Sequence, residues 1–177
     1  MPQGAVPRRY AEAAFALALE KGNLDRWRAD LRMAAALLSD PKLAARLEDP
    51  SVHTGAKHKV IDSAFTVELD PGVHKMLYLL ADRGRIASLP RVAEEFTAMA
   101  NKEQGIVVAT VVTAVPLDEK HERAVAERLK TLANAKQVEL RNHVDPRIIG
   151  GIIARIGDEL YDGSIRTRLA QLAERIG

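Results

Sequence analysis

The chain has 177 residues, of which 47% are hydrophobic and 28% charged, values ordinary for a globular protein with one large or two small domains. It contains no cysteine, which excludes disulfides, thiolate zinc sites, iron–sulfur clusters and thiol nucleophiles. Its 26 basic and 24 acidic side chains leave a net charge of +2, which is small for a protein that coats nucleic acid by charge.

Residues 8–104 predict an almost entirely helical domain. Alanine, the best helix former, is abundant in the first helix, which Gly22 ends, and Asn23 is expected to cap the next helix. Asp-Pro pairs at Pro41 and Pro71 mark two further starts, because aspartate caps a helix and proline fits its first position. The expected helices are 8–21, 24–38, 41–47, 54–65, 73–83 and 88–104.

Residues 105–177 change from helical to alternating periodicity. β-Branched residues 106–115 predict a buried strand, residues 138–144 a half-buried strand and residues 148–156 a third strand. Asp118 is expected to cap a helix between the first two strands, and Gly157-Asp158 predicts a two-residue type II′ hairpin. A last helix follows Ser164, with a face expected to pack in the core: Ile165, Leu169, Leu172 and Ile176.

The sequence therefore predicts an α+β fold. Residues 1–104 are expected to form a six-helix bundle, and residues 105–177 a small α+β domain with a short sheet and two helices. No apolar run reaches the roughly 18 residues of a membrane span, and residues 1–7 lack a signal-peptide pattern. We therefore expect a cytosolic protein without a targeting segment.

The chemistry-bearing residues form no recognisable catalytic, cofactor-binding or metal-binding motif. The five histidines are dispersed and are expected to be solvated surface residues. Residues 54–57 predict a helix N-terminus rather than a phosphate loop, and Asp158 and Asp162 are expected to serve a turn and a cap. Gly150 and Gly151 are expected inside a strand, at a bulge or close backbone approach.

The first and fifth helices carry more apolar surface than one core needs. At 100° per residue the apolar arc of the first helix spans about 240°, whereas packing on one core needs somewhat more than 100°. Leu79 is apolar on a face otherwise occupied by Lys75 and Arg83. Either the first helix is central in the bundle, or the surplus forms a groove for a partner helix. In the second case Phe15 and Leu19 face the core, and the groove is lined by Tyr10, Ala14, Leu17 and Leu79.

Three stretches resemble the delta-subunit family of F-type ATP synthases, which includes the mitochondrial oligomycin-sensitivity-conferring protein. The most specific stretch is GGIIARIGDELYDGSIRTRL, residues 150–169. Supporting stretches are YAEAAF, residues 10–15, and LLADRGRIASLP, residues 79–90. The alanine-rich first helix without an N-terminal extension is similar to that of bacterial members.

The resemblance implies a non-catalytic peripheral-stalk subunit, present once per complex, that resists rotor torque during proton-driven ATP synthesis. Residues 1–104 would bind the N-terminal segment of the alpha subunit on the catalytic head, through Tyr10, Ala14, Leu17 and Leu79. Residues 105–177 would bind the C-terminal end of the b subunits. The residues assigned there to structure or partner binding are Gly150, Gly157, Arg166 and Arg168. The resemblance implies that the protein has no cofactor, binds no nucleic acid and does not insert into the membrane. It also implies that the protein lies, as part of the complex, at the cytoplasmic face of a bacterial cell membrane.

A second class of function remains open from the residues alone. Eight of the eleven basic residues in 105–177 are arginines, which is compatible with an RNA- or ribosome-associated module. The same region has one aromatic residue, Tyr161, and so lacks platforms for stacking bases.

Overall fold

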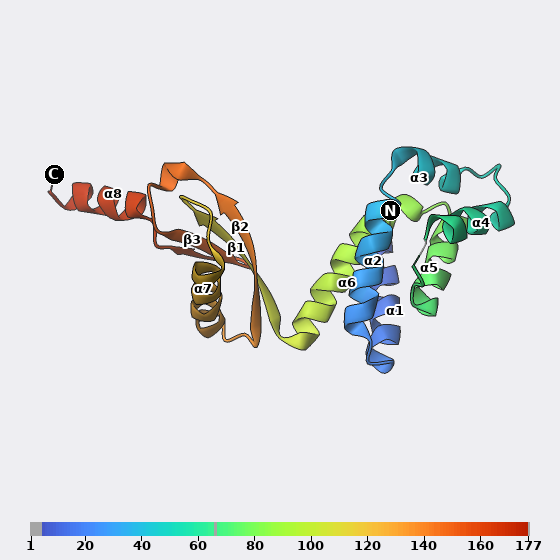
Figure 1. Cartoon of the computed structure of the whole chain (residues 1–177), viewed down its shortest axis with the longest axis horizontal. Helices are drawn as coiled ribbons and strands as arrows, with labels where there is room; N and C mark the ends of the chain where they lie inside the picture. Colours follow the sequence, from blue (N-terminus) through green and yellow to red (C-terminus); the bar gives the residue numbers. More distant parts are fainter. Residues whose placement is uncertain (1–4, 66, 177) are drawn as a thin grey trace. The chain divides into compact units, whose positions relative to one another are not determined.

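The computed structural model describes residues 5–65 and 67–176. The first helix forms in an alanine-rich stretch, because alanine is the best helix former. Gly22 ends this helix in the left-handed conformation, with φ +64°. The helices of the first part are α1 (Ala5–Glu20), α2 (Leu24–Leu37), α3 (Pro41–Glu48), α4 (Thr54–Ala64), α5 (Pro71–Asp82), the short 3₁₀ helix η1 (Ile86–Ser88) and α6 (Leu89–Gln104). Figure 1 shows them in blue to green.

Helix caps explain several of these boundaries. Asp40 accepts hydrogen bonds from the first backbone amides of α3, and Asp70 accepts one from Gly72 at the start of α5. The expectation that Asn23 caps α2 was wrong. Its side chain makes no cap hydrogen bond and instead donates from Nδ2 to Asp70 Oδ2 at 2.9 Å. A polar contact between two helix starts therefore replaces the local cap.

One apolar cluster fills the first unit. Trp27 stacks on Phe96 with ring centroids 6.2 Å apart, and Phe15 meets Phe96 edge to face at 6.4 Å. Helix α1 faces this cluster with small residues, Ala11, Ala14 and Ala18. The expectation that Leu19 faces the core was wrong, because its side chain is 44% exposed. The small side chains allow α1 to approach closely, so its alanine face lies inward and Leu19 lies outside.

The second part of the chain contains a mixed four-stranded sheet, and the fold class is α+β as predicted. Its elements are β1 (Ile106–Thr113), α7 (Glu119–Leu132), β2 (Gln137–Val144), the 3₁₀ turn η2 (Pro146–Ile148), β3 (Ile152–Ile156), β4 (Glu159–Asp162) and α8 (Ile165–Ile176). The strand order is β2-β1-β3-β4. Strand β1 is parallel to β2 and antiparallel to β3, which forms the predicted hairpin with β4.

The third strand is shorter than its sequence predicts. Residues 146–148 form η2, and extended structure begins only at Ile152. The backbone reason is that Ile149 and Gly151 adopt positive φ values, +68° and +79°, which a strand cannot contain. Gly150 and Gly151 therefore lie before the strand, where the expectation had placed them inside it.

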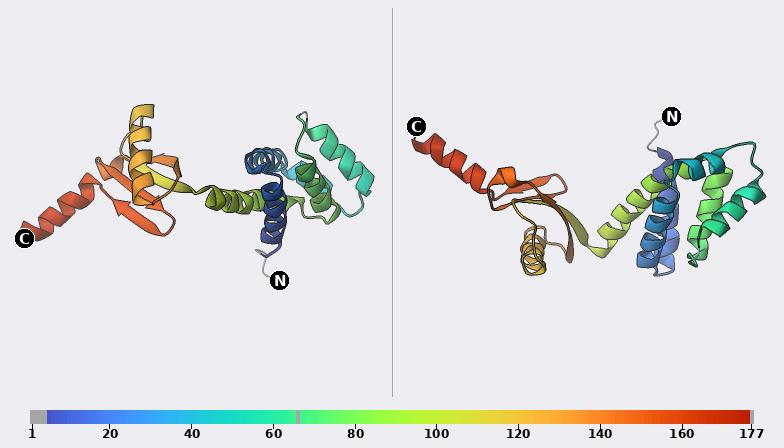
Figure 2. Two further views of the ribbon diagram at one scale, coloured as in Figure 1. Left: turned by 90° about the horizontal axis from the view of Figure 1, so that it is seen from below. Right: turned by 45° about the horizontal axis from the view of Figure 1, so that its top comes forward.

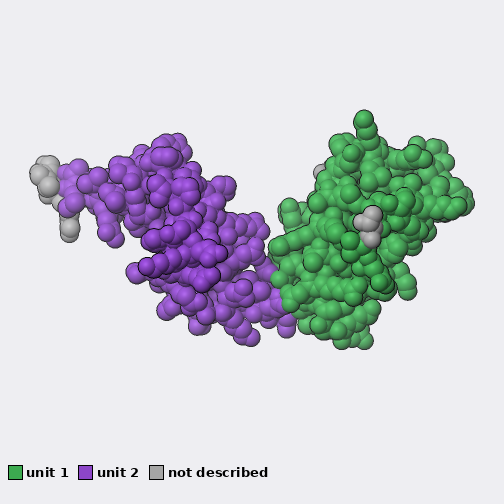
Figure 3. Space-filling view, in the orientation of Figure 1, with its two compact units in different colours: residues 1–100 green, residues 101–177 purple. Residues whose placement is uncertain are grey.

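The two parts form separate compact units, residues 1–100 and 101–177 (Figure 3). In the second unit α7 covers one face of the sheet, as the two views of Figure 2 show. Its apolar cluster is small, with Ala109, Val111, Leu129 and Ala154 buried. Helix α8 contacts η2 through its first turn and then projects from the sheet (Figures 1 and 2).

Candidate functional site

A hollow of 200 Å³ lies between α1 and α5. The four residues that the helical wheels assigned to a groove all line it, although they come from two helices about 60 residues apart in sequence: Tyr10, Ala14, Leu17 and Leu79. The other lining residues are Ala13, Trp27, Gly72, Lys75 and Met76. The tertiary structure thus gathers the apolar surplus of the two helices into one concave surface.

The hollow has a buried floor and an exposed rim. Ala14 and Met76 are only 2% and 9% exposed and belong to the core cluster. Tyr10 is half-buried and packs against the same cluster. Leu17 and Leu79 are 48% and 44% exposed on the rim. Folding of the first unit therefore fixes the shape of the hollow, while two aliphatic side chains stay available at its edge.

Trp27 and Gly72 form part of this floor, and sequence analysis missed both. Trp27 is almost fully buried, and a Cβ added at Gly72 would lie 2.4 Å from Trp27 Cζ2. No real Cβ contact is that short, so only glycine at this position leaves the indole in place. A glycine in the first turn of a helix, where alanine has the higher helix propensity, was the available sequence signal.

Lys75 supplies the single charged side chain among the residues that line the hollow. It is exposed and takes part in no ion pair or hydrogen bond between side chains in the described part of the chain. The surface is therefore apolar with one cationic edge, which favours an apolar segment that also carries a carboxylate.

A second, larger hollow of 640 Å³ lies within the second unit. Helix α7 contacts β2, and the hollow lies between α7 and the strands β3 and β4. Val125, Leu129 and Leu132 of α7 form the apolar wall, and Ile152 and Ala154 of β3 form the floor. Two arginines, Arg128 of α7 and Arg168 of α8, also line this hollow.

The structure does not bring the four C-terminal candidate residues into one site. Gly150 lies against the first turn of α8, where an added Cβ would lie 2.7 Å from Ile165 Cδ1. Gly157 lies in the β3–β4 turn, with φ +58° and open space around it. Arg166 is exposed near Asp145, and Arg168 lines the second hollow. The two glycines therefore have backbone roles, whereas the two arginines are accessible charges.

The apolar face of α8 is exposed, and the expectation that it packs in the core was wrong. Ile165, Leu169 and Leu172 are 43%, 52% and 51% exposed. The side chain of Ile176 lies outside the described residues. The physical reason is that α8 leaves the sheet after its first turn, so the described residues of the second unit do not cover its apolar stripe. We call these three residues the α8 stripe.

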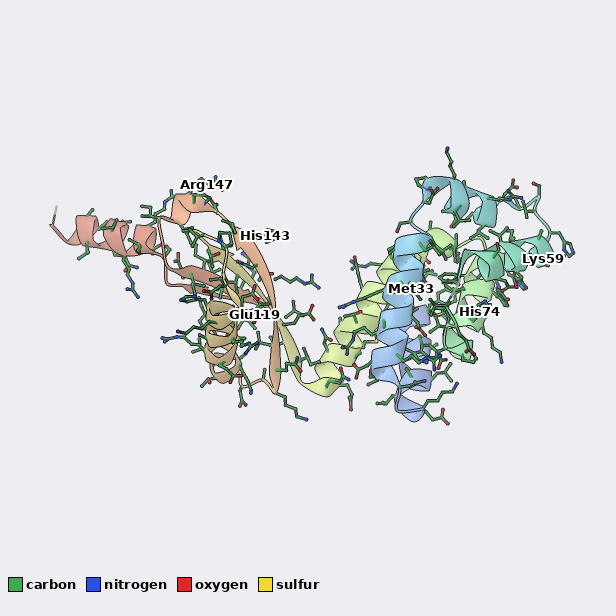
Figure 4. The ribbon with its side chains drawn as sticks, viewed as in Figure 1. Met33, Lys59, His74, Glu119, His143 and Arg147 are labelled. Carbon is green, nitrogen blue, oxygen red and sulfur yellow. The ribbon has the colours of Figure 1, made fainter. Side chains whose placement is uncertain are left out.

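Two histidines are less isolated than their spacing suggested. His58 and His74 both lie on the Tyr78 ring, with centroids 3.9 and 4.7 Å away. His58 Nε2 is 2.9 Å from Asp82 Oδ1. His74, which is labelled in Figure 4, places its Nε2 3.0 Å from Asp62 Oδ1. The Tyr78 hydroxyl donates to Asp62, and this hydrogen bond raises the pKa of Tyr78 to about 12. The cluster joins α4 to α5 and has a structural role.

The described residues exclude two classes of site. Within residues 5–65 and 67–176, no group of three or more acidic or histidine side chains is arranged to hold a metal ion. In the same residues, no helix combines the length and hydrophobicity that crossing a bilayer requires. What the structure offers is two apolar surfaces, each with accessible positive charge.

Comparisons with known proteins agree over almost the whole chain. The family model described as ATP synthase delta (OSCP) subunit matches residues 6–176. ATP synthase subunit delta of Anaeromyxobacter dehalogenans is 37% identical over 180 residues, covering 99% of each chain. The same subunit of Symbiobacterium thermophilum is 38% identical over 177 residues, covering 99% of this chain and 95% of that protein. A chain in the structure of the Toxoplasma gondii mitochondrial ATP synthase hexamer superposes with a TM-score of 0.69 at 25% identity, covering 97% of both chains.

Proposed function

Because the chain belongs to the ATP synthase delta (OSCP) family, and is therefore a structural subunit of the peripheral stalk rather than an enzyme, we propose that its two units bind different partners. Residues 1–104, acting as one six-helix bundle, bind the N-terminal helix of the alpha subunit. Residues 105–177 bind the C-terminal end of the b subunits. Family membership also decides against an RNA-associated module, the other class that the residues left open.

The hollow between α1 and α5 supports the first contact. An amphipathic helix can lay apolar side chains on the buried floor and against Leu17 and Leu79 on the rim. Burying one aliphatic side chain contributes about 1.5–3 kcal/mol, so two or three well-packed anchors suffice for strong binding after the cost of association. The single observation that carries this assignment is that exposed leucines from two helices border a preformed apolar floor.

The second unit supports the stalk contact through the α8 stripe and the nearby arginines. A 12-residue helix without tertiary packing is marginal in water, so α8 gains stability when a partner covers its stripe. Arg166 and Arg168 are exposed on this helix and favour a partner that carries carboxylates.

The role of such a subunit is mechanical. Proton flow turns the rotor, and the catalytic head turns with it unless the peripheral stalk resists the torque. This chain contributes binding free energy at its two ends and supplies no catalytic group. As part of the complex it lies at the cytoplasmic face of the bacterial cell membrane, an assignment that the bacterial relatives support.

Replacing Leu79 with aspartate tests the head contact. A synthetic peptide with the N-terminal sequence of the alpha subunit from the same genome is titrated into the full chain. The readouts are calorimetry and the fluorescence of Trp27, the only tryptophan, which lines the hollow. We expect Leu79→Asp to weaken binding by roughly 2 kcal/mol, about 30-fold, because it places a charge in an apolar contact. Tyr10→Asp should weaken binding similarly.

Leu19→Asp is the matched control, because Leu19 is also 44% exposed but does not line the hollow. It should bind the peptide as tightly as the unaltered chain. Unchanged affinity of a folded Leu79→Asp variant would refute the groove assignment.

A further inference from the structure

Ile149 combines two features that are rarely found together. Its φ of +68° and ψ of −40° lie in a region that β-branched residues avoid, because their Cβ clashes with the backbone there. Its side chain is also 63% exposed, so burial within this chain does little to offset the backbone strain. Glycine or asparagine would occupy this conformation at lower cost.

The neighbouring residues hold Ile149 in this conformation from both sides. Before it, the Arg147 guanidinium, labelled in Figure 4, donates to both carboxylate oxygens of Asp145 at 2.7 to 3.1 Å, and Ile148 is buried. After it, Gly150 O accepts a hydrogen bond from Ile165 N at 2.9 Å. A strained residue persists only where such surroundings over-determine the backbone, and that condition is met here.

These contacts connect Ile149 to the α8 stripe. The Ile165 side chain lies directly over Gly150, the residue that follows Ile149, and Ile165 is the first residue of the stripe. The apolar surface of α8 therefore begins at the corner between η2 and β3.

Charge around this corner indicates the chemistry of its partner. Arg166 and Arg168 lie on the first turns of α8, and no acidic residue occurs in its first turn. Two carboxylates near the start of α8 are already engaged. Asp145 accepts hydrogen bonds from Arg147, which lower its pKa to about 2, and Asp162 accepts hydrogen bonds from Ser164 N and Thr167 Oγ1. An aliphatic surface with positive charge on one side fits an amphipathic helix that carries leucine-type side chains and carboxylates.

We propose that Ile149 is a strained anchor residue, which extends the α8 stripe and inserts into the acidic, aliphatic helix of the stalk partner. The proposal rests on the proposed function, because that partner is the C-terminal end of the b subunits. In the free chain the conformation is unfavourable for isoleucine, and burial of the side chain in the complex compensates for it. Ile149 thus favours partner binding over the stability of the free unit.

Ile149→Asn tests the proposal, because asparagine tolerates positive φ and removes the aliphatic anchor. The full chain is titrated with the soluble C-terminal segment of the b subunit from the same genome, and thermal melting is followed separately. We expect binding to weaken about tenfold while the melting temperature is unchanged or higher. Leu160→Asn is the control, since Leu160 is 58% exposed on β4, near the β3–β4 turn and away from the corner. It should bind as the unaltered chain does.

The possible outcomes distinguish failure of the proposed function from failure of the anchor role of Ile149. If the unaltered chain does not bind the b segment, the proposed function and this inference both fail. If the unaltered chain binds and Leu169→Asp weakens binding, but Ile149→Asn binds normally, only the anchor role is overturned. Weaker binding by Ile149→Asn with a lower melting temperature also overturns it, because Ile149 would then support the fold.

Discussion

The two units differ in how completely each buries its own apolar residues. The first closes a core around Trp27 and Phe96 and leaves a hollow whose floor belongs to that core. The second buries a few residues between α7 and the sheet, and leaves the α8 stripe and Ile149 exposed. One surface is therefore preformed when the unit folds, whereas the other stays exposed on the second unit and, in the proposed function, is covered by a partner.

If both surfaces bind partners as proposed, the two units show two ways of making a docking surface. A preformed floor lowers the entropy lost on binding, so a short helix with few anchors can bind tightly. An exposed helix loses more conformational freedom on binding but offers a long stripe along the partner. In the proposed function, a stalk subunit that binds the head at one end and the b subunits at the other uses both kinds of contact.

The largest expected effect is destabilisation of the fold of the second unit, while the first unit stays folded. Gly151→Ala would place a Cβ 2.4 Å from the Gly163 carbonyl oxygen at a φ of +79°, so the backbone must move. We expect a loss of about 3 kcal/mol in the stability of this unit. Urea unfolding followed by circular dichroism reports the whole chain, and Trp27 fluorescence reports the first unit.

Gly157→Ala is the control for this prediction. It has a similar φ of +58° but nothing within 4 Å of an added Cβ, so only the conformational cost of about 1 kcal/mol applies. If Gly151→Ala unfolds like the unaltered chain, the close approach between Gly151 and the Gly163 carbonyl is not needed for the fold.

A smaller effect is expected at the preformed floor. Gly72→Ala should displace Trp27, lower the stability of the first unit by about 1–2 kcal/mol and weaken binding of the alpha peptide. Gly55→Ala occupies the same position in α4 but meets its nearest atom, His53 Nδ1, at 3.4 Å. Its higher helix propensity should make that variant neutral or slightly more stable. Equal melting curves and equal Trp27 emission for both variants would contradict a rigid floor.

The smallest expected effect is on the pH dependence of stability, through the Asp145–Arg147 pair beside Ile149. Hydrogen bonds from Arg147 lower the pKa of Asp145 to about 2, below its usual value near 3.9. The stabilisation is therefore fully present above about pH 4 and is lost as the pH falls toward 2. Asp145→Asn should lower the melting temperature slightly at pH 7, and the difference from the unaltered chain should shrink steadily as the pH falls from 4 to 2. A difference of the same size at pH 4 and at pH 2 would show that the carboxylate charge is not the cause.

Local patterns predicted much of the fold because their causes are local. Asp40, Asp70 and Asp118 cap the helices that follow them, and the Gly157 turn joins β3 to β4, since caps and turns depend on neighbouring residues. The wheel positions of Tyr10, Leu17 and Leu79 were enough to select residues of one hollow. The contact between Trp27 and Gly72 could not be predicted from local patterns, because it joins two helices far apart in sequence.

Sequence alone determined the family, the α+β class and the presence of surplus apolar surface, because motif, periodicity and composition are properties of the chain itself. It could not determine which apolar face is buried. Leu19 and the α8 stripe have the spacing of core residues, yet both are exposed, since burial depends on whether another element lies opposite. Only the tertiary structure decided that, and only it revealed the left-handed backbone of Ile149, which the contacts on either side of this residue impose.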